Sequence, residues 1–159
     1  MIENILVAVE GSLESLMTAK YAICLSKLLN ARLTVVYVVD EKTLKDLLKS
    51  RIFVEVEAME YERDLVEQGE TFLVRIKALA ESKKVQVETQ VLRGVVNEEI
   101  TRKAGDLQAC LLVMGEPRHK MSRVDTYYDE GEKILRGVPC PVVIAKNAEM
   151  IEKVFKELK

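Results

Sequence analysis

The sequence predicts an α/β fold of three layers, with a five-stranded parallel sheet between two layers of helices. Short apolar runs alternate with segments of helical periodicity along the chain, which is typical of successive βαβ units. The runs at 5–9 and 33–39 are continuous and rich in β-branched residues, as in strands that are covered on both faces. The 159 residues, 48% of them hydrophobic, suit one domain with a full core.

The first βαβ unit has a clear helix start. Ser12 follows the strand at 5–9 and can cap a helix by accepting hydrogen bonds from first-turn amides. Apolar residues then recur at helical spacing, and we expect the helix to end near Asn30. The strand at 33–39 completes a right-handed unit.

The connection from 40 to 84 is the longest, and most of it is predicted to be helical. A single buried stripe is expected on it, formed by Val56, Met59, Val66, Leu73, Ile76 and Ala80. Gly69 lies inside this helix at a cost of about 1 kcal/mol against alanine, which packing can offset. For residues 41–53 the sequence allows two alternatives, a shorter helix or a loop over the sheet edge.

The second half of the chain continues the alternation. Apolar and polar residues alternate at 85–91, which predicts an edge strand with one exposed face. A helix at 97–104, a buried strand at 109–114, a helix at 125–136 and the strand Val142–Ala145 follow. In such sheets, ligands bind beyond the carboxyl ends of the strands, where the strand order reverses.

Residues 147–159 lie beyond the last strand and are predicted to extend the domain at 1–146 with an amphipathic helix capped by Asn147. Its apolar stripe consists of Met150, Ile151, Val154, Phe155 and Leu158. This stripe either packs on its own domain or contacts a partner protein or a second subunit.

The composition argues against two classes of function. A formal net charge of -2 gives no global basic surface, which disfavours nucleic-acid binding. No apolar run approaches the ~18 residues of a membrane helix, and no basic segment followed by an apolar one opens the chain. We therefore expect a cytoplasmic protein without a membrane association.

Cysteine and histidine usage predicts no metal site. Cys24, Cys110 and Cys140 form no CxxC pair and are odd in number, which disfavours a disulfide framework or a zinc site. We expect three buried, unreactive thiols, since free cysteine behaves mostly as a small hydrophobe. His119 is the only histidine in the chain and stands among charged residues, so a solvated loop residue is expected.

The order and spacing of several short motifs together resemble those of the universal stress protein family. The segments that carry the resemblance are VAVEGS at 7–12, VYVVD at 36–40, RG at 93–94, LVMG at 112–115 and PCPVV at 139–143. The resemblance covers residues 3 to about 146. It implies a flavodoxin-like or adenine-nucleotide α-hydrolase-like fold with strand order 3-2-1-4-5. It also implies a homodimer, commonly paired through the last strand, Val142–Ala145 in this chain.

The ATP-binding branch of that family is similar to Gly-x2-Gly-x9-Gly-Ser/Thr after the fourth strand. Without gaps, this frame falls on Gly115, Arg118, Tyr128 and Asp129, so only its first position matches. Glycines at such positions let backbone amides approach phosphate. Asp129 would instead place a carboxylate near it, and two like charges ~4 Å apart repel by roughly 4 kcal/mol at an effective dielectric constant of about 20.

Other residues leave ATP or another adenine nucleotide as an alternative. The resemblance places Val38 and Met114 in the adenine pocket, although ordinary core packing at strand ends also explains them, and it places Ala8 in the same nucleotide pocket. Glu10 stands where the family usually has an aspartate near the nucleotide. Arginine can also bind phosphate bidentately without a glycine cradle. The basic cluster comprises Arg118, His119, Lys120 and Arg123, and it alternatively neutralises nearby carboxylates in a solvated loop.

Three hypotheses of function follow. The first is a noncatalytic regulatory or stress-response dimer without tight ATP binding, since three of the four frame positions are lost. The second is an adenine-nucleotide sensor or slow ATPase that uses Arg118 and Lys120 in place of the loop glycines. The third is an interaction module whose C-terminal helix docks on another protein. No set of residues has a catalytic pattern, because Glu10 and Asp129 would need a nucleophile that the sequence does not disclose.

Overall fold

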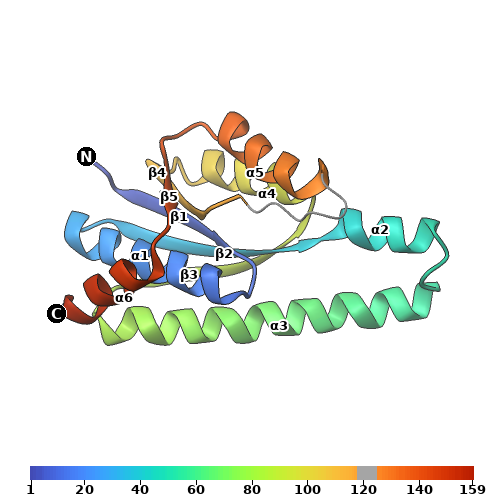
Figure 1. Ribbon diagram of the computed structural model, residues 1–159, viewed down its shortest axis with the longest axis horizontal. Coiled ribbons are helices and arrows are strands. Elements are labelled where there is room, and N and C mark those ends of the chain that lie inside the picture. Colours follow the sequence, from blue (N-terminus) through green and yellow to red (C-terminus); the bar gives the residue numbers. More distant parts are fainter. Residues whose placement is uncertain (118–124) are drawn as a thin grey trace.

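A twisted sheet of parallel strands lies between two groups of helices (Figure 1). The structure, a computed structural model, describes residues 1–117 and 125–159, and the side chains of these residues except at 125–129. In this part of the chain the sheet has five strands in the order β3-β2-β1-β4-β5, and all of its pairings are parallel. The predicted fold class and strand order are confirmed.

The elements follow the predicted alternation. The strands are β1 (Asn4–Val9), β2 (Arg32–Asp40), β3 (Val87–Gly94), β4 (Leu111–Gly115) and β5 (Val142–Ala145). The helices are α1 (Leu13–Leu29), α2 (Glu41–Lys49), α3 (Glu55–Ser82), α4 (Val96–Asp106), α5 (Asp125–Gly137) and α6 (Ala148–Glu157).

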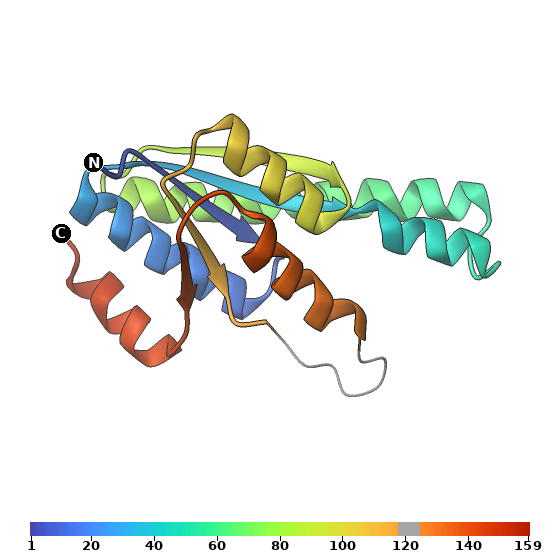
Figure 2. The ribbon, with the colours of Figure 1, turned by 90° about the horizontal axis from the view of Figure 1, so that it is seen from above.

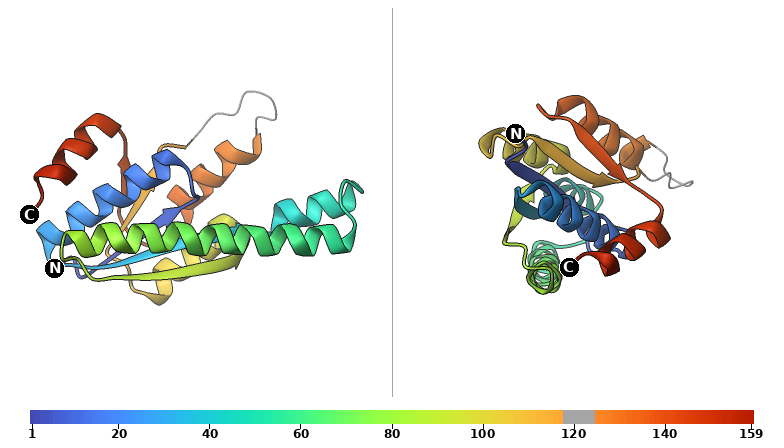
Figure 3. Two further views of the ribbon diagram at one scale, coloured as in Figure 1. Left: turned by 90° about the horizontal axis from the view of Figure 1, so that it is seen from below. Right: turned by 90° about the vertical axis from the view of Figure 1, so that its left-hand side faces the viewer.

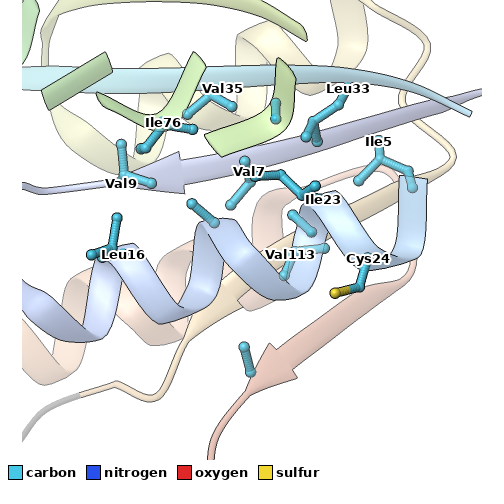
Figure 4. Close-up of a cluster of buried hydrophobic side chains, with 14 of the residues drawn as sticks. Ile5, Val7, Val9, Leu16, Ile23, Cys24, Leu33, Val35, Ile76 and Val113 are labelled. Atoms are coloured by element: carbon cyan, nitrogen blue, oxygen red, sulfur yellow. The ribbon is translucent and has the colours of Figure 1, made fainter. Parts of the chain in front are cut away.

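Each face of the sheet has its own apolar core. Helices α1, α3 and α6 cover one face, and α4 and α5 cover the other (Figures 1 and 3). On the first face, the side chains of Ile23, Val7 and Val113 meet between α1 and the central strands and have no exposed surface (Figure 4). On the second face, Leu6 and Leu112 are equally buried. The central strands are thus covered on both sides, which explains their continuous apolar runs.

Helix α1 begins and ends at the predicted residues. The Ser12 hydroxyl accepts a hydrogen bond of 3.1 Å from the backbone N–H of Ser15, which caps the first turn. Asn30 adopts the left-handed conformation with φ of 53°, which terminates the helix.

Helix α3 is longer than the sheet that it covers. Its 28 residues span about 42 Å at 1.5 Å per residue. Its first half and α2 stand beyond the carboxyl ends of the strands (Figure 2). The prediction that Val56 and Met59 belong to the buried stripe is therefore wrong, because they lie on this projecting part and are 64% and 65% exposed. Leu73, Ile76 and Ala80 are buried against the sheet as predicted.

The segment at 41–53, for which the sequence allowed two alternatives, contains a helix. Asp40 caps α2 by accepting from the backbone N–H groups of Lys42 and Thr43, at 3.0 and 3.4 Å. The helix ends at Lys49, and the turn that follows leads into α3 beyond the strands instead of crossing the sheet edge.

Strand β3 lies at one edge of the sheet, as predicted, but its bounds are shifted. It begins at Val87 and continues to Gly94, while the alternating segment starts two residues earlier. The pairing with β2, from Leu33 beside Val87 to Asp40 beside Gly94, determines these bounds. Val85 lies before the strand and is buried there, so its apolar character reflects burial and not membership of the strand.

Helix α6 packs on its own domain, which is one of the two alternatives for the C-terminal stripe. Asn147 caps it by accepting from the backbone N–H of Met150 at 3.2 Å. Ile151 and Phe155 are buried in the core shared with α1, and Lys20 of α1 forms an ion pair of 2.7 Å with Glu152. Met150 of the predicted stripe is 49% exposed.

The cysteines differ from one another in burial. Cys24 is buried on the inner face of α1, as predicted, and burial raises the pKa of its thiol. Cys110 and Cys140 are only partly buried, so the prediction of three buried thiols is wrong for these two. Both precede a strand, at the amino-terminal edge of the sheet, where the layers of helices cover them incompletely.

The described helices include none that is long and apolar enough to cross a membrane.

Candidate functional site

Three apolar residues of the predicted pocket lie on one face of the sheet, near the carboxyl ends of β1, β2 and β4. Ala8 pairs with Val36, two residues before Val38 on the same face of β2. Ala8, Val38 and Met114 all contact the core beneath α4 and α5. Met114 is 7% exposed, whereas Ala8 and Val38 are partly exposed. Together these three residues form an apolar wall beside the strand ends.

Gly115 is the one glycine that the chain shares with the loop motif, and packing against helix α1 favours glycine at this position. A Cβ at this position would lie 3.2 Å from Thr18 Oγ1 on helix α1. Thr18 is buried, and its hydroxyl donates a hydrogen bond of 2.9 Å to the carbonyl of Glu14. Close packing between β4 and α1 therefore favours glycine here without any ligand.

Glu10 forms two hydrogen bonds with residues at the start of helix α1. The Ser12 hydroxyl donates to its carboxylate at 3.0 Å, and the backbone N–H of Glu10 donates to Ser15 Oγ at 2.6 Å. These bonds orient the turn between β1 and α1.

Glu10 also lines a depression of about 580 Å³, between this turn and α3, together with Tyr37 and Arg75. Tyr37 belongs to the core beneath α1 and α3, so this depression opens on the side opposite the apolar wall. Burial raises the pKa of Tyr37, and the negative charge of Glu10 adds to that effect.

Part of the predicted site lies outside the described residues. This holds for Arg118, His119, Lys120 and Arg123 of the basic cluster. Tyr128 and Asp129 belong to helix α5, but their side chains are also outside the description.

Glu130, which the sequence suggested only as one of the carboxylates neutralised by the basic cluster, follows these positions and has another partner. Glu130 Oε2 accepts a hydrogen bond of 3.0 Å from the backbone N–H of Asn97, in the first turn of α4. With its nitrogen turned toward Glu130, the side-chain amide of Asn97 donates a second bond of 3.0 Å. Helix α4 has Val95 at its N-cap, which offers no side-chain acceptor. Glu130 of α5 thus places a negative charge at the N-terminus of α4, which stabilises that helix end.

The described part of the chain contains no group of three or more His, Cys, Asp or Glu side chains that could hold a metal ion.

The arrangement of these elements has known counterparts. The family model of the universal stress protein family matches residues 1–146. This chain belongs to the universal stress protein family. A universal stress protein of Methanocaldococcus jannaschii is 28% identical over 145 residues, which are 91% of this chain and 82% of that protein.

Solved universal stress proteins share the fold. A family member from Burkholderia pseudomallei superposes with a TM-score of 0.71 at 25% identity, over 92% of this chain and 97% of that one. The universal stress protein of Archaeoglobus fulgidus in complex with dAMP superposes with a TM-score of 0.64 at 14% identity, over 92% of this chain and all of that one.

Proposed function

We propose that this universal stress protein is a noncatalytic regulatory or stress-response homodimer of the cytoplasm, and that it has lost tight ATP binding. The contact between Glu130 and the first turn of α4 carries the proposal. It fixes a carboxylate, one residue after Asp129 in the chain, at the start of α4.

Charge repulsion supports the loss of phosphate binding. Asp129 and Glu130 are consecutive acidic residues at the loop frame. At an effective dielectric constant of about 20, each carboxylate within ~4 Å of a phosphate charge would cost roughly 4 kcal/mol. An ordinary hydrogen bond contributes only about 1 kcal/mol net, so several new bonds would be needed to offset one such repulsion.

The exposed edge of the sheet supports the homodimer. Strand β5 is paired only with β4 within the described residues, and it ends the sheet on that side. Ile144 is 40% exposed, and Val142 and Val143 are partly exposed. A bare apolar edge strand invites uncontrolled pairing, so a defined partner strand from a second copy is physically favourable.

Mass spectrometry of the purified protein tests the proposal. Protein prepared without added nucleotide is denatured, and the released small molecules are identified. We expect no adenine nucleotide in stoichiometric amount. A co-purified nucleotide near one equivalent per chain would refute the loss of tight binding.

The retained apolar wall supports a second candidate, an adenine-nucleotide sensor or slow ATPase. Ala8, Val38 and Met114 offer an apolar surface against which a base can stack, and the Archaeoglobus relative was solved with dAMP. Arg118 and Lys120 would then bind the phosphate in place of the loop glycines. This candidate requires that Arg118→Ala weaken nucleotide binding at least tenfold, whereas Arg75→Ala, on the opposite side of the sheet, leaves the affinity unchanged.

A further inference from the structure

Two partly exposed cysteines lie side by side at the amino-terminal edge of the sheet. Strands β4 and β5 pair in parallel with Leu112 beside Val142, and the backbone N–H of Leu112 donates to the carbonyl of Pro141 at 3.0 Å. Cys110 and Cys140 precede these strands, and the same register continued backwards by two residues sets Cys110 beside Cys140. This edge is opposite the carboxyl ends of the strands, so the pair is independent of the candidate nucleotide site.

The spacing of neighbouring strands suits a bond between the two sulfur atoms. Adjacent strands lie about 4.7–4.9 Å apart. A disulfide joins residues whose Cα atoms are about 4.4–6.8 Å apart. Side chains two residues apart on a strand point to the same face, so extending the two strands backwards places Cys110 on the face of Leu112 and Cys140 on that of Val142. Leu112, Val142 and Cys140 all contact the core beneath α4 and α5.

The two thiols differ in their surroundings. The Cys110 Sγ atom lies 3.9 Å from the carbonyl oxygen of Met1, at the surface of the chain. The backbone N–H groups of Asn4 and Glu3 lower the pKa of the Cys110 thiol. Burial raises the pKa of the Cys140 thiol, and a negative charge on Cys110 raises it further, which agrees with their proximity. Cys110 is therefore the better nucleophile and Cys140 the better resolving thiol.

We propose that Cys110 and Cys140 form a reversible intramolecular disulfide in response to hydrogen peroxide. The Cys110 thiolate attacks one peroxide oxygen, the O–O bond breaks, and Cys110 becomes a sulfenic acid while the other oxygen leaves as water after taking up a proton. The Cys140 sulfur then attacks the Cys110 sulfur, the S–O bond breaks, and a second water leaves. Two thiols are oxidised to one disulfide, and one peroxide is reduced to two waters.

A dithiol reductant reverses the bond by thiol–disulfide exchange. The disulfide covalently links the edge strand β5 to its neighbour β4. The disulfide therefore constrains β5, the strand proposed to form the dimer contact.

Peptide mapping of the full chain after peroxide treatment tests the proposal. Trypsin releases Cys110 within residues 104–118 and Cys140 within residues 137–146, so a linked pair of peptides identifies the bond. We expect this pair in peroxide-treated protein after blocking of the remaining thiols, and its loss after incubation with dithiothreitol. The number of titratable thiols in the denatured chain is expected to fall from three to one.

Single variants separate the roles of the two thiols. Cys24→Ala should leave the linked peptides unchanged, because Cys24 lies in the other core. Cys140→Ser should stop the reaction at a sulfenic acid on Cys110, which dimedone labels. A disulfide between two copies of Cys110, or complete oxidation of Cys110 in the wild type without a link to Cys140, would overturn the proposal.

Discussion

The aromatic ring of Tyr37 lies so close to the backbone of Gly69 that a Cβ added to Gly69 would come within 2.7 Å of the ring Cδ1 atom. Tyr37 belongs to β2 and is 8% exposed, and Gly69 lies in the middle of α3. At this point the backbone of α3 lies directly against the ring of Tyr37, with no side chain between them. Gly69 has a low helix propensity, but the packing of α3 against Tyr37 requires a glycine at this position.

Gly69→Ala should destabilise the protein, although alanine is the better helix former. The helix propensity of alanine is favourable by about 1 kcal/mol, but overpacking a filled core typically costs about 1–3 kcal/mol. We therefore expect a net loss of up to about 2 kcal/mol in the free energy of unfolding, measured by denaturant titration. Gly105→Ala is the matched control, since no atom lies within 4 Å of its added Cβ, and it should stabilise α4 by up to about 1 kcal/mol. Equal effects of the two substitutions would contradict the packing account.

Glu130→Ala should weaken the start of helix α4. It removes the acceptor of the Asn97 backbone N–H, and loss of a helix cap typically costs about 0.5–2 kcal/mol. Glu132→Ala serves as the control, because in the described part of the chain Glu132 forms a surface ion pair with Arg136 one turn away, at 2.6 Å, and no other. Such pairs contribute about 0.3–0.5 kcal/mol. Chemical denaturation of both variants gives the comparison, and a Glu130 variant as stable as the Glu132 variant would show that the cap contributes little.

The ion pair between Lys20 and Glu152 should make the docking of α6 sensitive to acid. The hydrogen bond from Lys20 lowers the pKa of Glu152. The folded state thus binds this proton less readily than the unfolded chain, so the contribution is complete above the ordinary glutamate pKa of about 4.3 and is lost as the pH falls through the lowered pKa. The difference in the free energy of unfolding between the wild type and Glu152→Gln should therefore shrink below that pH.

Glu149→Gln is the control for this pH dependence, since Glu149 lies on the same helix and forms no ion pair in the described part of the chain. A difference for Glu152→Gln that stays constant across the acid range would exclude the Lys20 contact as its cause.

Ile144→Lys should convert the proposed dimer into a monomer. A lysine on the edge strand places a charge in an apolar contact, which opposes strand pairing between copies. Sedimentation equilibrium is expected to give twice the chain mass for the wild type and a single chain mass for the variant. Ile52→Lys, at a site that is 63% exposed on the projecting end of the molecule, should remain a dimer. A wild type that is monomeric at micromolar concentration would rule out the homodimer.

The order of strands and helices was predictable because the central strands are buried on both faces. Val7, Val35 and Val113 have no exposed surface, and such positions select apolar, β-branched residues throughout a strand. The bounds of β3 were less predictable, because pairing with β2 determines them and periodicity does not. Val56 and Met59 continue the helical period of α3 past the end of the sheet, so their pattern alone could not distinguish a buried from an exposed position.

The candidate site was predictable only where local sequence carries a signal. The grouping of Ala8, Val38 and Met114 follows from their places at the ends of parallel strands. The contact of Glu130 with Asn97 joins residues 33 positions apart and has no periodic signature. The one local hint was Val95, which stands at a helix start without a capping side chain. The approach of Thr18 to Gly115 likewise depends on how α1 crosses β4.

Calorimetric titration of ATP tests the central claim most directly. The wild type is compared with the triple variant Arg118→Gly, Tyr128→Gly, Asp129→Ser, which restores the glycines and the hydroxyl of the loop frame. We predict no measurable heat of binding for the wild type at micromolar concentrations, and a tighter interaction for the variant. Micromolar or tighter binding of ATP by the wild type would contradict the account.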